Sequence, residues 1–132
     1  MKVLIVYHSL YGHVLQLARA VEEGVKSVAG VEAVFRRAPE FPHTEKELES
    51  GDGYASKVWN EQKATPACTL DDLRECDGLL FGSPTRYGNM TAQMKALIDS
   101  TGASGCPARW KANPRASSLR RPRRMAGRKR RV

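Results

Sequence analysis

The chain has 132 residues, of which 41% are hydrophobic and 27% charged, close to the composition of ordinary globular domains. This composition excludes a wholly disordered chain. The apolar run near the start, residues 3–7, is far shorter than the roughly 20 residues that span a bilayer, and no signal-peptide cleavage site follows it. We therefore expect a cytoplasmic protein with no membrane contact.

The formal charge of +8 is distributed unevenly. Residues 1–102 carry 11 Lys and Arg against all 14 Asp and Glu, a net charge of −3, whereas residues 103–132 carry the other 11 basic residues and no acid. We interpret 1–102 as a mildly acidic domain and 103–132 as a basic tail. The tail has few large apolar residues and no regular hydrophobic period, so we expect it to be disordered.

Cysteine usage gives no sign of a cross-linked or metal-bound fold. The three cysteines, Cys68, Cys76 and Cys106, are odd in number and form no C-x-x-C pair. Neither a disulfide framework nor a zinc site is therefore expected, and the thiols are interpreted as buried or incidental.

The first predicted elements are a strand, a helix and a second strand. Residues 3–7 (VLIVY) form the continuous apolar run of a strand that is covered on both faces in a parallel sheet. Apolar residues then recur at steps of three and four, which predicts a helix that ends near Gly30. Residues 31–35 predict a parallel strand that Pro39 and Pro42 end. The expected helix face consists of Val14, Leu17, Ala18, Val21, Val25 and Val28.

The second part of the domain begins with a polar stretch. Residues 40–66 show only a weak helical signal at 45–48, so we expect a long, partly ordered connection. Thr69, followed by two aspartates, is a good N-cap for a short helix over 70–75. Residues 78–82 (GLLFG) predict a third buried strand. The last predicted helix has a face made of Met90, Met94, Leu97 and Ile98.

This alternation of strands and helices indicates a doubly wound parallel α/β sheet of three layers, in which ligands bind at the carboxyl ends of the strands. The loop after the first strand begins a helix, whose free N–H groups suit an anion. Its glycine lets a phosphate approach the backbone, and its serine offers a hydroxyl. No G-x-G-x-x-G is present, so a mononucleotide is favoured over a dinucleotide. The alternative is a serine-capped helix without a ligand. The loop residues are Ser9, Leu10, Tyr11, Gly12, His13 and Val14.

A second loop follows the third strand and is expected at the same edge of the sheet. A rigid proline, a glycine and several side-chain donors suit a planar heterocycle with polar edges, on which the tyrosine could stack. The alternative is a turn before a capped helix, with its arginine in solvent. The residues concerned are Pro84, Thr85, Arg86, Tyr87, Gly88 and Asn89.

Together the two loops resemble those of the flavodoxin-like NAD(P)H:quinone oxidoreductases of the WrbA family. The resemblance rests on KVLIVYHSLYGHV at 2–14 and FGSPTRYGNM at 81–90, and it covers residues 1–102. It implies FMN, with the phosphate on Ser9–Val14 and the isoalloxazine on Pro84–Asn89. It also implies Tyr11 near the nicotinamide of NAD(P)H, a homotetramer, and two-electron reduction of a quinone by way of hydride transfer to the flavin.

The cofactor would carry this chemistry, so we expect neither a catalytic side chain nor a metal. His13 could act as a proton donor, but a histidine at a helix start is more often a loop contact. Arg86 near the flavin could favour its anionic reduced form; the alternative is a structural or solvated arginine.

The resemblance stops after Gly102, where the family continues with two more strands, a further flavin loop and a histidine that reaches the active site. The Arg, Pro, Ala, Ser and Gly bias of residues 103–132 is typical of a GC-rich gene read in the wrong frame, so we hypothesise a frameshift near Gly102 that impairs activity. The alternative is a genuine basic tail. It would bind nucleic acid through phosphate attraction, without sequence preference.

Overall fold

The computed structural model describes residues 1–104, so the expected tail lies outside it from residue 105 onward. Within that part, three strands form one parallel sheet in the order β2-β1-β3. This is the flavodoxin-like doubly wound arrangement that the sequence predicts. In chain order the elements are β1 (Lys2–Tyr7), α1 (His13–Lys26), β2 (Glu32–Arg37), α2 (Pro42–Ser50), α3 (Tyr54–Gln62), α4 (Leu70–Glu75), β3 (Gly78–Gly82) and α5 (Ala92–Ser104).

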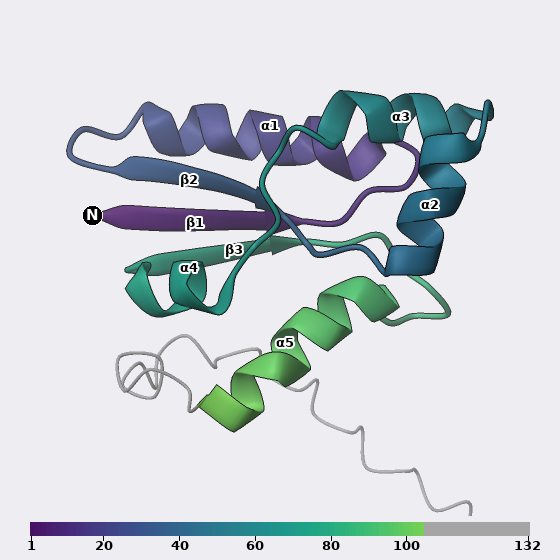
Figure 1. Ribbon diagram of the computed structural model, residues 1–132. Coiled ribbons are helices and arrows are strands. Elements are labelled where there is room, and N and C mark those ends of the chain that lie inside the picture. Colours follow the sequence, from purple (N-terminus) through teal and green to yellow (C-terminus); the bar gives the residue numbers. More distant parts are fainter. Residues whose placement is uncertain (105–132) are drawn as a thin grey trace, which may run out of the picture.

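The helices lie on both sides of the sheet (Figure 1). α1 covers one face and α3 lies beside it, whereas α4 and α5 lie on the other face. α2 stands at the end of the sheet where the strands finish. No helix within residues 1–104 is both long and apolar enough to cross a membrane.

The core consists of two clusters, one on each face of β1. Successive side chains of a strand point to opposite faces. Leu4 and Val6 therefore pack with α4 and α5, whereas Ile5 and Tyr7 pack with α1. All four are at most 2% exposed, and burial of each aliphatic side chain among them contributes about 1.5–3 kcal/mol. The expectation of a strand covered on both faces is confirmed.

The predicted face of α1 is partly wrong. Leu15, which the pattern left out, is buried with Ala18, whereas Leu17 is 66% exposed and Val28 is 55% exposed. α1 packs mainly on β1 and β2 and less on β3. Leu17 and Val21 instead line an open groove of about 330 Å³, together with Leu80 and Phe81 of β3. The prediction of a third buried strand is therefore wrong for Leu80 and Phe81, which are 43% and 45% exposed.

The connection over residues 40–66 is more ordered than predicted, because it contains α2 and α3. Pro42 lies in the first turn of α2, where its missing N–H costs nothing, so it starts a helix after the strand has ended. Leu48 of α2 and Val58 and Trp59 of α3 are buried, each at 7% exposure or less. Burial of these few side chains stabilises helices whose short polar sequences give a weak signal.

Three predicted elements also begin or end at other residues than expected. α1 ends at Lys26, and Gly30 lies in the following turn with φ 77°. β2 continues to Arg37, two residues past the prediction. Met90 precedes α5 and is 38% exposed, so it is not part of the buried helix face, whereas Met94 and Leu97 are buried as expected.

Cys68 and Cys76 are buried cysteines in the cluster formed with α4 and α5. Burial, together with the charge of Asp72, raises the pKa of Cys68 to about 12. Since the thiolate is the reactive form, this cysteine is chemically inert at neutral pH. Cys106 lies outside the described residues.

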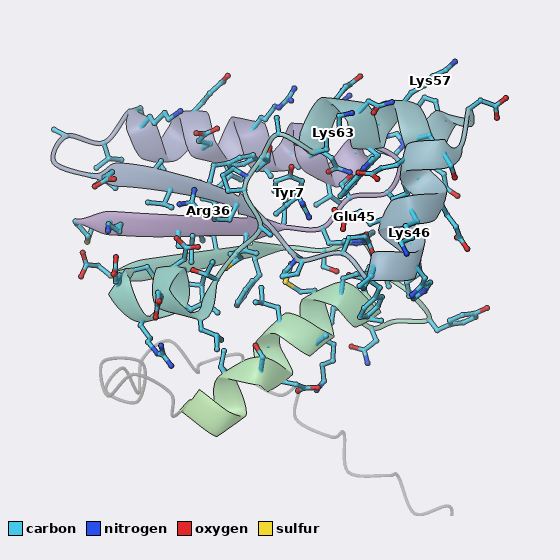
Figure 2. All side chains as sticks on the ribbon, in the orientation of Figure 1. Tyr7, Arg36, Glu45, Lys46, Lys57 and Lys63 are labelled. Carbon is cyan, nitrogen blue, oxygen red and sulfur yellow. The ribbon has the colours of Figure 1, made fainter. Side chains whose placement is uncertain are left out.

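The N-cap of α4 is confirmed in detail. Thr69 Oγ1 accepts a hydrogen bond from the Asp72 amide at 3.1 Å, and Asp72 Oδ2 accepts one from the Thr69 amide at 2.9 Å, which makes a reciprocal capping box. Arg36, labelled in Figure 2, donates to Asp72 from β2 at 3.2 Å. The cap therefore ties α4 to the sheet.

Replacing this cap should destabilise the fold. Thr69→Ala is expected to lower the free energy of unfolding by about 1 kcal/mol, because the Asp72 amide loses its acceptor. Urea unfolding followed by circular dichroism measures the change. The control is Ser50→Ala, since the Ser50 hydroxyl donates only to carbonyls of its own helix. Equal effects of the two substitutions would contradict the role of the cap.

Candidate functional site

The loop between β1 and α1 is a preorganised backbone turn. Gly12 is the N-cap of α1 and has φ 84°, in the left-handed region that favours glycine. Buried Ser9 accepts the Gly12 amide through Oγ at 3.1 Å, but it is not the N-cap residue. The first helical hydrogen bond runs from the Gln16 amide to the Gly12 carbonyl, so the amides of residues 13–15 have no acceptor within the helix. These amides form a site at the helix N-terminus that suits an anion.

Helix α3 supports this loop from behind. Gln62 is 4% exposed, and its Nε2 donates to the Ser9 carbonyl at 2.7 Å. A Cβ atom on Gly12 would lie 3.5 Å from the side chain of Val58. Neither Gln62 nor Val58 is predicted from the sequence, because a polar connection 53 residues from Ser9 carries no local signal of this contact.

The loop after β3 is a tight hairpin. The Arg86 and Asn89 backbones exchange hydrogen bonds of 2.7 and 3.0 Å. Between them Tyr87 has φ 51° and Gly88 has φ 79°, the two positive values of a type I′ turn. The expectation that Gly88 permits unusual backbone angles is confirmed. The Tyr87 side chain is fully exposed.

Side chains also close the base of this hairpin. Ser83 Oγ accepts the Thr91 amide at 3.1 Å and donates to the Pro84 carbonyl at 3.0 Å. Asn89 Oδ1 accepts the Met90 amide at 2.8 Å, which leaves the two amide protons of Asn89 as the donors that it can offer outward. The loop thus holds its shape through its own hydrogen bonds.

The two loops converge, as the sequence predicts for neighbouring parallel strands. They enclose a pocket of about 170 Å³, and a second hollow of about 500 Å³ opens beyond it, sharing Leu10 and Arg86. Neither lining contains a carboxylate, which suits an anionic ligand. Thr85, Tyr87 and Gly88 line neither space. The smaller pocket is lined by Ser9, Leu10, Tyr11, His13, Val14, Pro84 and Arg86.

Two of the predicted aromatic and basic residues lie at the mouth of the pocket. Tyr11 is 52% exposed and stacks on Tyr54 of α3, with ring centroids 6.5 Å apart. His13 is exposed at the start of α1. Within residues 1–104 no group of three His, Cys, Asp or Glu side chains could hold a metal ion.

A buried carboxylate joins the segments around the site. Glu40 Oε2 lies 3.1 Å from His8 Nε2, and Glu40 Oε1 accepts from Gln93 Nε2 at 2.6 Å and from the Phe41 amide at 3.0 Å. Its side chain is 4% exposed. It therefore connects the end of β1, the start of α2 and the first turn of α5. Sequence reasoning missed this cluster, since its members come from three distant segments.

The protonation state of Glu40 determines how much this cluster stabilises the fold. Burial by itself would raise the pKa of Glu40, but the hydrogen bonds from His8, Gln93 and the Phe41 amide outweigh it and hold the pKa below the ordinary value of 4.5. Since the folded-state pKa is lowered, the ionised carboxylate stabilises the fold at and above neutral pH. This stabilisation is lost as the pH falls below 4.5 and through the lowered pKa.

Glu40→Gln should therefore have a pH-dependent effect on stability. At pH 7 we expect the free energy of unfolding to fall by about 1–3 kcal/mol, because a charged acceptor of three hydrogen bonds is removed. At pH 3 the difference from the parent chain should shrink. Urea titrations at both pH values measure it, with Glu49→Gln on the exposed side of α2 as the control. A difference that is independent of pH would contradict the ionised state of Glu40.

The fold and the converging loops define a doubly wound α/β protein with its candidate site at the carboxyl edge of the sheet. Residues 1–117 match the profile of the family described as NADPH-dependent FMN reductase. The chain therefore belongs to the NADPH-dependent FMN reductase family.

Curated relatives are longer than this chain. Proteins named NAD(P)H dehydrogenase (quinone) from Syntrophobacter fumaroxidans and Solidesulfovibrio magneticus are each 48% identical to it over 102 residues, and one from Acidithiobacillus ferrooxidans is 43% identical over 101 residues. The alignments cover 77%, 77% and 76% of this chain and 48%, 49% and 47% of the relatives. The chain thus spans about half the length of the relatives that it matches.

Proposed function

We propose that the chain carries the FMN-binding loops of a WrbA-type NAD(P)H:quinone oxidoreductase. The observation that carries this proposal is the convergence of a helix N-terminus and a type I′ hairpin on one carboxylate-free pocket. Relatives named NAD(P)H dehydrogenase (quinone) support the same activity for this chain.

The residues present fit a flavin mononucleotide. The left-handed Gly12 and the unpaired amides of residues 13–15 would hold the phosphate, with Ser9 behind them. Pro84–Asn89 would hold the isoalloxazine, with the Arg86 guanidinium at its edge. When bound, FMN supplies hydride acceptance from NAD(P)H and two-electron delivery to a quinone. The protein's part is to bind and orient.

Further roles follow from the same proposal. Tyr11, at the mouth of the pocket, would lie near the nicotinamide of NAD(P)H. His13 would be a loop contact rather than a proton donor. We also propose a cytoplasmic homotetramer, as the WrbA resemblance implies.

We propose that residues 1–102 are the flavin-binding part and that residues 103–132 are a separate basic segment. The three alignments above cover 101 or 102 of the 132 residues, about the length of the proposed flavin-binding part, although the family profile reaches residue 117. The pocket of about 170 Å³ between the two loops is smaller than the roughly 300–1,000 Å³ of ligand sites in general. The adjoining hollow of about 500 Å³ is lined mainly by residues outside the loops, so the loops by themselves enclose only part of a flavin nucleotide. We therefore propose weak flavin binding and impaired turnover for the 132-residue chain.

A second candidate function rests on the charge distribution. The 11 basic residues and absent acids of 103–132 favour non-specific binding of nucleic acid by phosphate attraction. These residues lie almost wholly outside the described part of the chain. Flavin absorbance that copurifies with the protein separates this function from the first.

Flavin preference tests the phosphate site. FMN should bind more tightly than riboflavin in a fluorescence titration, because only FMN carries the phosphate. Gly12→Asp should weaken FMN binding at least tenfold, about 1.4 kcal/mol, because it adds a negative charge to the loop that would hold the phosphate. The added Cβ would face Val58 of α3, and aspartate is among the residues found more often at positive φ, so this substitution strains the loop less than most others would.

The matched control is Gly24→Asp, an exposed position later on α1 where an added Cβ meets no atom within 4 Å. FMN affinity should be unchanged in this variant. Equal affinities of the parent chain for FMN and riboflavin would refute the phosphate site, even if both flavins bind.

The proposed loss of turnover is tested by comparing this chain with a longer chimera. We expect little oxidation of NADPH by benzoquinone with the 132-residue chain and added FMN. A chimera is made by joining residues 1–102 to the part of the Syntrophobacter fumaroxidans relative that follows its matched segment. This chimera should oxidise NADPH with benzoquinone. Comparable rates for the two proteins would show that the loops of residues 1–102 suffice.

A further inference from the structure

Three buried polar atoms behind the first loop have no hydrogen-bond partner within the described part of the chain. They are Tyr7 Oη, His8 Nδ1 and Trp59 Nε1. Such atoms are rare in folded proteins, because a buried donor or acceptor without a partner costs about 1–3 kcal/mol. Burial raises the pKa of Tyr7, and the nearby Thr65 hydroxyl offsets part of that rise without reaching standard hydrogen-bond geometry.

All three residues line the same small cavity. Its volume is about 10 Å³, and Ser9, Arg37 and Glu40 also line it. That space is close to the minimum of about 10–15 Å³ that one water molecule needs, and a buried water typically has two to four polar partners. Tyr7 lies at the end of β1 nearest to α2 and α3 in Figure 2. Ser9 lines both this cavity and the candidate pocket, so the two spaces are neighbours.

The donors and acceptors select the ligand. The Trp59 indole N–H can only donate, which disfavours a cation. The lining also carries both the Arg37 guanidinium and the Glu40 carboxylate, whose opposite charges together favour neither an anion nor a cation. In the tautomer whose Nε2–H donates to Glu40, His8 presents Nδ1 as an acceptor. Tyr7 Oη can donate or accept. A neutral molecule with both donors and acceptors matches this set.

We propose that the cavity binds one structural water molecule, which accepts from Trp59 Nε1 and donates to His8 Nδ1 and Tyr7 Oη. The water satisfies all three atoms and fixes the tautomer of His8. It links β1 to α3, where Gln62, one turn after Trp59, holds the Ser9 carbonyl. The water therefore braces the first loop from behind, independently of any bound flavin.

Nuclear magnetic resonance of the ¹⁵N-labelled 132-residue chain tests this water site. The Trp59 indole N–H should show a cross-peak at the water frequency with the sign of a long-lived contact. Trp110→Phe assigns the Trp59 signal, since these are the two tryptophans of the chain. Absence of the cross-peak would overturn the proposal.

The Tyr7 hydroxyl could produce the same signal by exchanging its proton with solvent, so the control is Tyr7→Phe. The cross-peak should persist in this variant, because Trp59 and His8 still hold the water. Its loss in a folded variant would assign the signal to the tyrosine and overturn the proposal.

A second measurement uses the parent chain alone and needs no variant to fold. The imidazole ¹⁵N shifts of His8 should report a protonated Nε2 and an unprotonated, hydrogen-bonded Nδ1 at neutral pH. A proton on Nδ1 would overturn the proposed arrangement.

Discussion

Strand β1 pairs with β2 on one side and β3 on the other, and α1 and the α4–α5 pair cover its two faces. A strand enclosed in this way has a single direction and register, since a slip by one residue would exchange its two buried faces. The position of the first loop follows from that constraint. The second loop follows β3, which runs parallel to β1, so both loops leave the sheet at the same edge.

The first loop needs support that its own residues do not supply, whereas the second is held by hydrogen bonds within its own hairpin. The first loop turns at Gly12, where glycine adopts the positive φ without strain. The side chains that hold this end of the sheet are polar and buried. Gln62 holds the first loop through the Ser9 carbonyl, and Glu40 joins the end of β1 to α5 through Gln93. Helices α2 and α3 thus belong to the site's support, although their side chains barely line it.

The groove between α1 and β3 is apolar and exposed, in contrast to the polar and buried support of the loops. Leu17 and Val21 of α1 and Leu80 and Phe81 of β3 are each at least 41% exposed around one groove. Apolar surface of this kind is uncommon unless other protein covers it. Its position beside the edge strand distinguishes it from the candidate site, whose lining is carboxylate-free and partly basic.

The sequence by itself determined the doubly wound fold, the central strand, the N-cap at Thr69 and the two loops. Each of these rests on local chemistry: an unbroken apolar run, a threonine before aspartates, and glycines at turns. Only the tertiary structure decided that α3 forms, that Leu17 stays exposed, and that Glu40, Gln62 and Gln93 meet the loops. Those outcomes depend on contacts between residues far apart in sequence, because burial and hydrogen bonding are set by what packs nearby and leave no periodic pattern in any one segment.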